Sequence, residues 1–343
     1  MEELSLSVVI PAYNAAGTVG ATLACMHREL KEAAAVFPEF NYEILVVDDG
    51  STDGTRDVVT ALGIPGVKVL SKPNTGVSDT RNFGLRHATK KYLWYFDADD
   101  LLFKDSVARL VEFLSLGPDL LKFSSVTEDA LTRNHIESFN NSSTARVTFD
   151  GRYADFLCDN TVGFSSCFII VRRELLLASG VTFDPAISIS EDVVWNIGLA
   201  LKNPEARIIV TDLNAGRYIV NTASTVNTAS ITRNKLHLDG SMRFLAFVES
   251  ELPGPSYMHR SLSVFRTNAV NQIITRFLSC RFKGPELKKR MKETLAIVDN
   301  SGVESRQVQV FRHLAASPLL MRAAQMLYRR VFLPYVKPRL GRN

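Results

Sequence analysis

Cysteine is scarce in this chain, with four among 343 residues. No two of them form a C-x-x-C pair, so neither a structural zinc site nor a disulfide framework is predicted. We expect reduced thiols that are mostly buried. The four are Cys25, Cys158, Cys167 and Cys280.

Long hydrophobic runs are absent as well. No stretch of about 18 apolar residues could span a membrane, and the first residues lead directly into an expected strand without the pattern of a signal peptide. The composition, 46% hydrophobic and 22% charged residues, is typical of a soluble globular protein. We therefore expect a cytoplasmic protein with one large or two ordinary domains.

Negative charge is lacking at the carboxyl end. The net charge is +4, but from Cys280 to Asn343 fourteen Lys or Arg residues face four Asp or Glu residues, which puts +10 on the tail and −6 on the rest. Such a tail suits a polyanion or an anionic membrane face. The amphipathic stretch Leu319 to Phe332 has two interpretations, a helix packed on its own protein or one lying on the cytoplasmic membrane surface. We expect no nucleic acid partner.

Two glycine-rich nucleotide motifs are also missing. No G-x-G-x-x-G follows the first apolar run, and G-x-x-x-x-G-K-[ST] occurs nowhere. These absences argue against a dinucleotide-binding fold and a P-loop. A nucleotide would have to be held in another way.

The first 115 residues nevertheless predict a nucleotide-binding half-sheet. Apolar, β-branched runs alternate with helical stretches, which is the pattern of βαβ units in a parallel sheet. The predicted strands are Leu4 to Pro11, Tyr42 to Asp49, Val67 to Ser71 and Tyr92 to Phe96.

The remaining chain predicts a second half of the same domain and then a helical region. We place a catalytic domain at residues 1–225, divided at 115/116, and a basic helical region at 226–343. The polar stretch Thr127 to Asp150 has weak periodicity and favours a mobile loop. Further strands are expected at Leu120 to Val126, Gly163 to Arg173, Ala206 to Thr211 and Arg217 to Val220.

Three aspartates follow the aromatic run Tyr92 to Phe96, namely Asp97, Asp99 and Asp100. Adjacent carboxylates repel one another unless a cation or a proton separates them, so a hard divalent ion shared with substrate phosphates is one interpretation. A turn followed by the N-cap of a helix from Phe103 to Leu114 is the other. The residues alone favour neither the metal site nor the turn with an N-cap.

A second acidic pair precedes the helical stretch Val193 to Leu201. Ser190 suits an N-cap there, and acids in the first turn of a helix are stabilised by its dipole. A purely structural interpretation of Glu191 and Asp192 is therefore that they stabilise the start of this helix.

Five motifs in order give the sequence its resemblance to family 2 glycosyltransferases, inverting enzymes with the GT-A fold. The likeness extends from about Leu4 to Leu201. The motifs are S-V-V-I-P-A-Y-N at Ser7 to Asn14, V-V-D-D-G-S-T-D-G-T at Val46 to Thr55, N-T-G-V-S-D-T-R-N-F-G-L at Asn74 to Leu85, F-D-A-D-D at Phe96 to Asp100 and S-E-D at Ser190 to Asp192.

The resemblance implies a nucleotide site. The end of the first strand, Pro11, Ala12, Tyr13 and Asn14, would lie beneath the base, with Tyr13 as the stacking or edge contact. Asp49 would accept a hydrogen bond from the base, unless it is a turn aspartate. Arg81 would lie near the base and phosphates, unless it is a surface arginine.

The resemblance also implies a metal and a catalytic base. Asp97 and Asp99 match the D-x-D that binds ribose and, through Mn²⁺ or Mg²⁺, the diphosphate, with Asp100 as a third candidate ligand. Asp192 matches the base, and Glu191 would orient the acceptor or act as a secondary candidate. Some GT-A enzymes carry a histidine as a further metal ligand; His237 is the nearest candidate, with an ordinary structural histidine as the alternative.

The function implied is transfer of a hexose or N-acetylhexosamine from a nucleotide diphosphate, UDP by preference, to a saccharide or polyprenyl-linked saccharide. In bacterial relatives such steps build capsule, exopolysaccharide or lipopolysaccharide. The alternative is a catalytically silent nucleotide-sugar-binding partner of another transferase. A D-x-D phosphatase is excluded by position, because the aspartates follow the fourth predicted strand and not the first.

Overall fold

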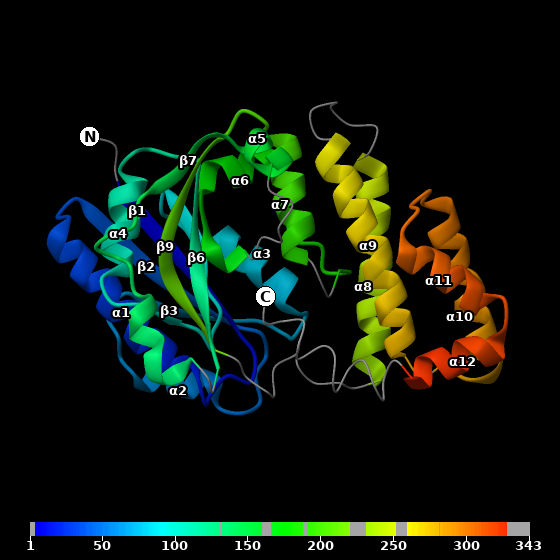
Figure 1. Cartoon of the computed structure of the whole chain (residues 1–343). Helices are drawn as coiled ribbons and strands as arrows, with labels where there is room; N and C mark the ends of the chain where they lie inside the picture. The colour runs from blue at the N-terminus through cyan, green and yellow to red at the C-terminus, as the bar shows by residue number, and fades with distance from the viewer. Residues whose placement is uncertain are drawn as a thin grey trace. The chain divides into compact units, whose positions relative to one another are not determined.

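The computed structural model describes residues 4–129, 132–159, 166–187, 191–219, 231–251, 259–280 and 282–327. The chain divides into two compact units (Figure 1). One consists of Met1–Pro185 with Glu191–Asn221 and the other of Ala186–Ser190 with Thr222–Asn343. The predicted domain boundary at residue 225 lies outside the described residues.

The first unit is built on a mixed sheet of nine strands in the order β3-β2-β1-β4-β8-β6-β9-β5, with β7 also paired to β9. Its first four strands are parallel, as the alternation of strand and helix predicts. Their unbroken apolar sequences suit strands covered on both faces. They are β1 (Leu4–Ala12), β2 (Phe40–Asp48), β3 (Val67–Ser71) and β4 (Tyr92–Tyr95).

Helices connect these strands and cover the sheet (Figure 1). The helix α3 lies so close to β1 that a Cβ added at Gly84 would be 2.3 Å from Val9 Cγ1. Glycine is therefore required there by packing, because Gly84 has an ordinary helical backbone. The helices are α1 (Val19–Val36), α2 (Thr55–Ala61), α3 (Val77–His87) and α4 (Ser106–Leu114).

The second half of the sheet is mixed. Strand β8 (Ile169–Arg172) runs antiparallel to both β4 and β6 (Leu120–Glu128), and β6 is parallel to β9 (Arg207–Ile219). The expected pair of strands at 206–211 and 217–220 is one long strand, because β9 continues through its pairing with β6 across two register shifts. Short β5 (Leu101–Leu102) pairs with β9 directly after the aspartates.

The prediction of a mobile loop at 127–150 is wrong. The segment contains the 3₁₀ helix η1 (Arg133–Phe139) and the start of β7 (Val147–Arg152), which pairs with β9. The side chains of β7 are mostly exposed or half-buried, which explains why its sequence lacks an apolar period. A bidentate contact from Arg207 to Asp150, at 2.8 and 2.7 Å, ties β7 to β9.

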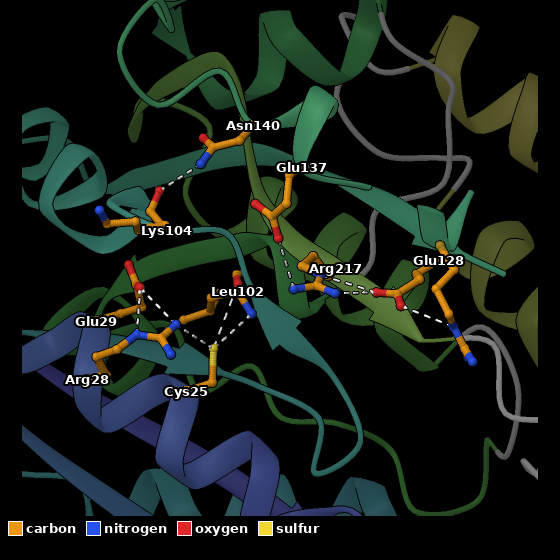
Figure 2. Close-up of polar contacts among 10 residues, drawn as sticks. Cys25, Arg28, Glu29, Leu102, Lys104, Glu128, Glu137, Asn140 and Arg217 are labelled. Atoms are coloured by element: carbon orange, nitrogen blue, oxygen red, sulfur yellow. Dashed lines mark hydrogen bonds and ion pairs between the residues drawn. The ribbon is translucent and has the colours of Figure 1, made fainter. Parts of the chain in front are cut away.

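Polar contacts fix the corner where β5, β9 and η1 meet (Figure 2). Arg217 donates to Glu128 Oε2 at 2.8 and 3.1 Å and to Glu137 Oε1 at 3.4 Å. On the α1 side, Leu102 N donates to Cys25 Sγ at 3.4 Å. The chain that leaves the aspartates is thus held on two sides.

Three short helices complete this unit, and the second unit is helical as predicted (Figure 1). Phe277, Phe282 and Phe311 pack together in the second unit, with ring centroids 5.3 and 5.5 Å apart. No helix among the described residues is both long and apolar enough to cross a bilayer. The helices are α5 (Tyr153–Asp159), α6 (Arg173–Ser179), α7 (Glu191–Lys202), α8 (Ile231–Glu251), α9 (His259–Ser279), α10 (Gly284–Asn300), α11 (Arg306–Ala315) and α12 (Pro318–Leu327), with the 3₁₀ turn η2 (Ser166–Phe168) before β8.

Candidate active site

The three aspartates form a turn at the carboxyl end of β4. Asp100 N donates to Asp97 O at 3.3 Å, which closes the turn. The helix that follows begins at Ser106, and its N-cap position is Asp105. The interpretation of the aspartates as a helix N-cap is therefore wrong, whereas the turn that the same interpretation expected is present.

The carboxylates of this turn face different partners. Asp97 and Asp99 are half-buried, whereas Asp100 is buried and its Oδ1 accepts a hydrogen bond from Ile219 N at 3.1 Å. Burial, and then the charge of Asp97, raises the pKa of Asp100 to about 8 and also raises the pKa of Asp99. Ionising all three carboxyl groups therefore costs free energy, which a bound cation would reduce.

Thr22, which lies outside the five motifs, stabilises the aspartate turn by hydrogen bonding. Thr22 on α1 is buried, and its Oγ1 lies 3.0 Å from Ala98 O and 2.9 Å from Asp100 O. The hydroxyl group therefore donates to backbone carbonyl oxygens of the motif. A threonine inside an apolar helical face was the only trace of this role in the sequence.

Arg81 joins two of the predicted site residues. Its Nη1 donates to Glu191 Oε1 at 3.0 Å and its Nη2 to Asp97 Oδ1 at 3.3 Å. The guanidinium group is buried and lies over the ring of Phe183, 5.2 Å from the centroid. Despite the cost of burial, the charges of Asp97 and Glu191 help raise its pKa above the ordinary arginine value. The alternative of a surface arginine is wrong.

Asp192 lies beside Glu191 in the first turn of α7 and is half-buried. Burial, and then the charge of Glu191, raises the pKa of Asp192 to about 7. The positive charge of Arg81 acts in the opposite direction and lowers this pKa. Its Oδ1 accepts a hydrogen bond from Val193 N at 2.8 Å. The predicted cap Ser190 lies outside the described residues.

An aromatic stack holds α7 against α3. Phe183 and Trp195 are parallel within 5° with centroids 4.9 Å apart. Asn82, next to Arg81, clamps the Phe183 backbone with two hydrogen bonds, 2.8 Å to its O and 2.9 Å from its N. Trp195 is buried. The roles of Asn82 and Phe183 had no sequence signal, because their partners are distant along the chain.

The end of β1 presents one exposed ring. Ala12 is buried and Pro11 half-buried, whereas Tyr13 is 52% exposed. Asn14 has a positive φ of 49° and holds the neighbouring loop, because its Oδ1 accepts a hydrogen bond from Thr52 N at 2.9 Å. Tyr13 is thus the member of the predicted base-binding set with a free face.

The Asp49 carboxylate is engaged by the loop between β3 and α3. Its Oδ1 accepts hydrogen bonds from Lys72 Nζ at 2.5 Å and Thr75 N at 3.0 Å, and its Oδ2 accepts one from Gly76 N at 2.9 Å. The carboxylate fixes the loop before α3. No sequence pattern indicated that Lys72 would bind Asp49. Its contact with a base stays a prediction, since these bonds occupy both oxygens and leave room only at remaining lone pairs.

The side chains near the aspartate turn determine whether a metal ion could be held there. Among the described residues no group of three or more His, Cys, Asp or Glu side chains could hold a metal ion. A magnesium-type ion, however, needs only one or two protein carboxylates when substrate phosphates and water supply the rest. Asp97 and Asp99 fit that arrangement. His237 belongs to α8 of the other unit, and its side chain lies outside what the structure describes.

Sequence comparison finds curated relatives that are named as glycosyltransferases. AmsB, the amylovoran biosynthesis glycosyltransferase of Erwinia amylovora, is 35% identical over 112 residues, which cover 31% of this chain and 35% of that protein. The uncharacterized glycosyltransferase YibD of Escherichia coli K12 is 26% identical over 247 residues, 69% of this chain and 65% of that protein. The chain thus spans 65% or less of the length of these curated relatives.

Solved structures resemble the chain over most of its length. Residues 1–349 of S. aureus TarS in complex with UDP-GlcNAc superpose with a TM-score of 0.64 at 16% identity, covering 95% of this chain and 92% of that one. Mannosyltransferase PcManGT of Pyrobaculum calidifontis, in complex with GDP-Man and Mn²⁺, gives a TM-score of 0.51 at 17% identity, covering 94% and 86%.

The parallel half-sheet with a carboxylate turn at its carboxyl edge, and these neighbours, show the GT-A fold, as predicted. The model of the family described as Glycosyl transferase family 2 matches residues 7–178, slightly more than half of the chain. The chain belongs to glycosyl transferase family 2, which confirms the resemblance seen in its motifs.

Proposed function

We propose that this protein transfers a sugar from a nucleotide diphosphate to a saccharide hydroxyl with inversion. The observation that carries the proposal is the Arg81 bridge, which brings Asp97 of the carboxylate turn and the Glu191-Asp192 pair to one edge of the sheet. Groups suited to a diphosphate and a group suited to proton transfer thus occur together. Crevices at this edge are where open α/β sheets bind ligands.

Asp192 is the proposed general base. A carboxylate whose pKa lies near 7 can take a proton from an acceptor hydroxyl more effectively than an ordinary aspartate. Glu191 raises that pKa and is itself held by Arg81, so we assign it to orienting and tuning the base. The hydroxyl oxygen would attack the anomeric carbon on the face opposite the diphosphate.

Mn²⁺ or Mg²⁺ would be held by Asp97 and Asp99 together with donor phosphates. Bound there, the ion supplies charge stabilisation of the leaving diphosphate. Asp100 is oriented toward Ile219 N, so we assign it first to the geometry of the turn. Tyr13 offers an exposed ring for the base of the nucleotide.

A UDP-sugar is the donor we favour, a hexose or N-acetylhexosamine, because the TarS neighbour is in complex with UDP-GlcNAc. The acceptor we propose is a saccharide or a polyprenyl-linked saccharide of a cell-surface polysaccharide such as capsule or lipopolysaccharide. A relative named for amylovoran biosynthesis supports the polysaccharide class. A cytoplasmic enzyme whose basic tail contacts the membrane would suit a lipid-linked acceptor.

The test is donor binding measured by thermal shift. Wild type, Asp99→Ala and the exposed control Glu39→Ala would each be melted with UDP, GDP, CDP and TDP, with and without Mn²⁺. A specific ligand raises the melting temperature according to its concentration over Kd. We expect a metal-dependent shift for UDP that Asp99→Ala loses and Glu39→Ala keeps. No shift for any nucleotide in wild type would contradict a donor site.

The second candidate is a catalytically silent partner that binds nucleotide sugar for another transferase. The presence of Asp97, Asp99 and Asp192 counts against it. Donor binding without hydrolysis or transfer to any acceptor pool would favour it.

A further inference from the structure

A basic pocket lies at the opposite edge of the sheet from the candidate active site. Lys90 and Lys91 precede β4, Arg172 ends the antiparallel β8, whose register pairs Tyr92 with Arg172, and Arg173 begins α6. Arg173 N also donates to Lys91 O at 2.8 Å. Two basic dipeptides 82 positions apart in the sequence are therefore fixed side by side.

These residues line a cavity of about 550 Å³. It is separated from the carboxylate turn by the length of β4, about 13 Å at the rise of an extended strand. Among the described residues that line it, Glu174 is the one acid; these residues are Ser5, Thr89, Lys90, Lys91, Arg172, Arg173, Glu174 and Leu177.

The four cations are not equally available. Arg172 is engaged by Asp119, 2.9 Å from its Nε to Oδ1, and by carbonyl oxygens, and Lys91 Nζ lies 5.6 Å from the centroid of the Tyr92 ring. Lys90 and Arg173 form no ion pair with acids among the described residues. Arg173 Nε is buried and has no hydrogen-bond acceptor there.

An unpaired buried guanidinium N–H beside other cations costs free energy unless an acceptor of opposite charge is present. A phosphoryl group suits this arrangement best, because it offers several oxygens and up to two negative charges, and a guanidinium group binds it through paired N–H donors. We propose that this pocket binds a phosphate-bearing anion, with Arg173 and Lys90 as the principal contacts. The site is separate from the proposed donor site.

Isothermal titration of the full chain with pyrophosphate tests this proposal. Chelator in the buffer removes divalent metal, and chloride keeps the ionic strength constant. We expect binding by wild type, weakened about tenfold or more in K90Q/R173Q, the scale of a lost charge-assisted contact. The matched control K31Q/K104Q removes two positive charges elsewhere and should bind as wild type. Asp99→Ala should also bind unchanged, which separates this site from the donor site.

A further variant guards against misfolding of the double substitution. Glu174 is exposed, so E174Q should fold normally and bind pyrophosphate more tightly than wild type. No binding by wild type, or equal binding by wild type and K90Q/R173Q, would overturn the proposal. Binding that appears only in E2Q/E3Q would overturn it too, because the acids that precede β1 in the sequence would then neutralise the pocket.

Vesicles distinguish the two sources of phosphate. Co-sedimentation with phosphatidylcholine vesicles containing phosphatidic acid would be compared between wild type and K90Q/R173Q. Vesicle binding reduced in the variant supports the site with a lipid headgroup as its ligand. Equal vesicle binding, together with pyrophosphate binding that the variant loses, supports it with a soluble phosphate.

Discussion

Arg81 and Glu191 are 110 positions apart in the chain and form a charge-assisted hydrogen bond of 3.0 Å. The same guanidinium group reaches Asp97 on the other side. One buried cation thus fixes the first turn of α7 relative to the end of β4. The position of the proposed base depends on this link, because Asp192 adjoins Glu191.

Replacing Arg81 should destabilise the first unit strongly. R81M leaves Glu191 and Asp97 in a partly buried site without their cation, a loss on the order of 3–5 kcal/mol in unfolding free energy. R81K keeps the charge but not the two-sided fork, so it should lie between wild type and R81M. Urea unfolding measures all three. An unfolding free energy for R81M equal to that of wild type would show that the bridge contributes nothing.

Thr22 should act on the carboxylate turn through its hydroxyl group. T22V keeps the shape but removes the donor to Ala98 O and Asp100 O, which should cost about 1 kcal/mol of stability and raise the KM for the nucleotide sugar. T22S keeps the donor and should restore the KM. Steady-state kinetics with T22V and T22S decide this. Equal KM values in the two variants would mean that only packing matters at this position.

The sequence predicted most of the local structure. The parallel strands, the helices between them and the carboxylate turn are written in contiguous runs whose period or turn chemistry is set by neighbouring residues. The family motifs also named both ends of the Arg81 bridge. These strands, helices and site residues could therefore be predicted from the sequence alone.

The contacts between distant segments could not be predicted in this way. The register shifts within the long strand β9 and the placement of the exposed strand β7 depend on pairings between distant strands, which no local pattern records. Thr22 and Lys72 are ordinary residues of a helix and a turn until the fold brings Asp100 and Asp49 against them.

The pH dependence of transfer should reflect Asp192. Its pKa is raised to about 7, and the base must be deprotonated, so kcat/KM should increase as pH rises through about 7 and level off above it. E191Q removes a neighbouring negative charge and should move the midpoint lower. A profile with its midpoint near the ordinary aspartate value would contradict the environment described for Asp192.

Stability should change in the opposite direction across the same range. The pKa of Asp192 is raised from its ordinary value of 3.8 to about 7 on folding, so between these pH values the folded state holds a proton that the unfolded chain has released. The stability that this proton contributes is fully present below the unfolded value and is lost as pH rises to about 7. D192N lacks this loss and should melt higher than wild type above about pH 7. A melting difference that is the same at acidic and alkaline pH would contradict this linkage.

Gly84 tests the packing of α3 on β1. G84A places a methyl group 2.3 Å from Val9 Cγ1, and such overpacking costs about 1–3 kcal/mol. V9A makes room, so the double variant G84A/V9A should lose less stability than the sum of the single variants. Additive losses in a denaturation cycle would show that Val9 is not what excludes a larger residue.

The most direct test of the account is a parallel measurement of transfer and donor binding in D192N. Wild type, D192N and the exposed control E39Q would be given UDP-sugar, Mn²⁺ and a pool of saccharide acceptors, and donor Kd would be measured on the same preparations. We expect D192N to lose transfer by about 10²-fold or more while its donor Kd stays close to that of wild type and E39Q. Turnover by D192N equal to that of wild type would contradict the assignment of Asp192 as the base.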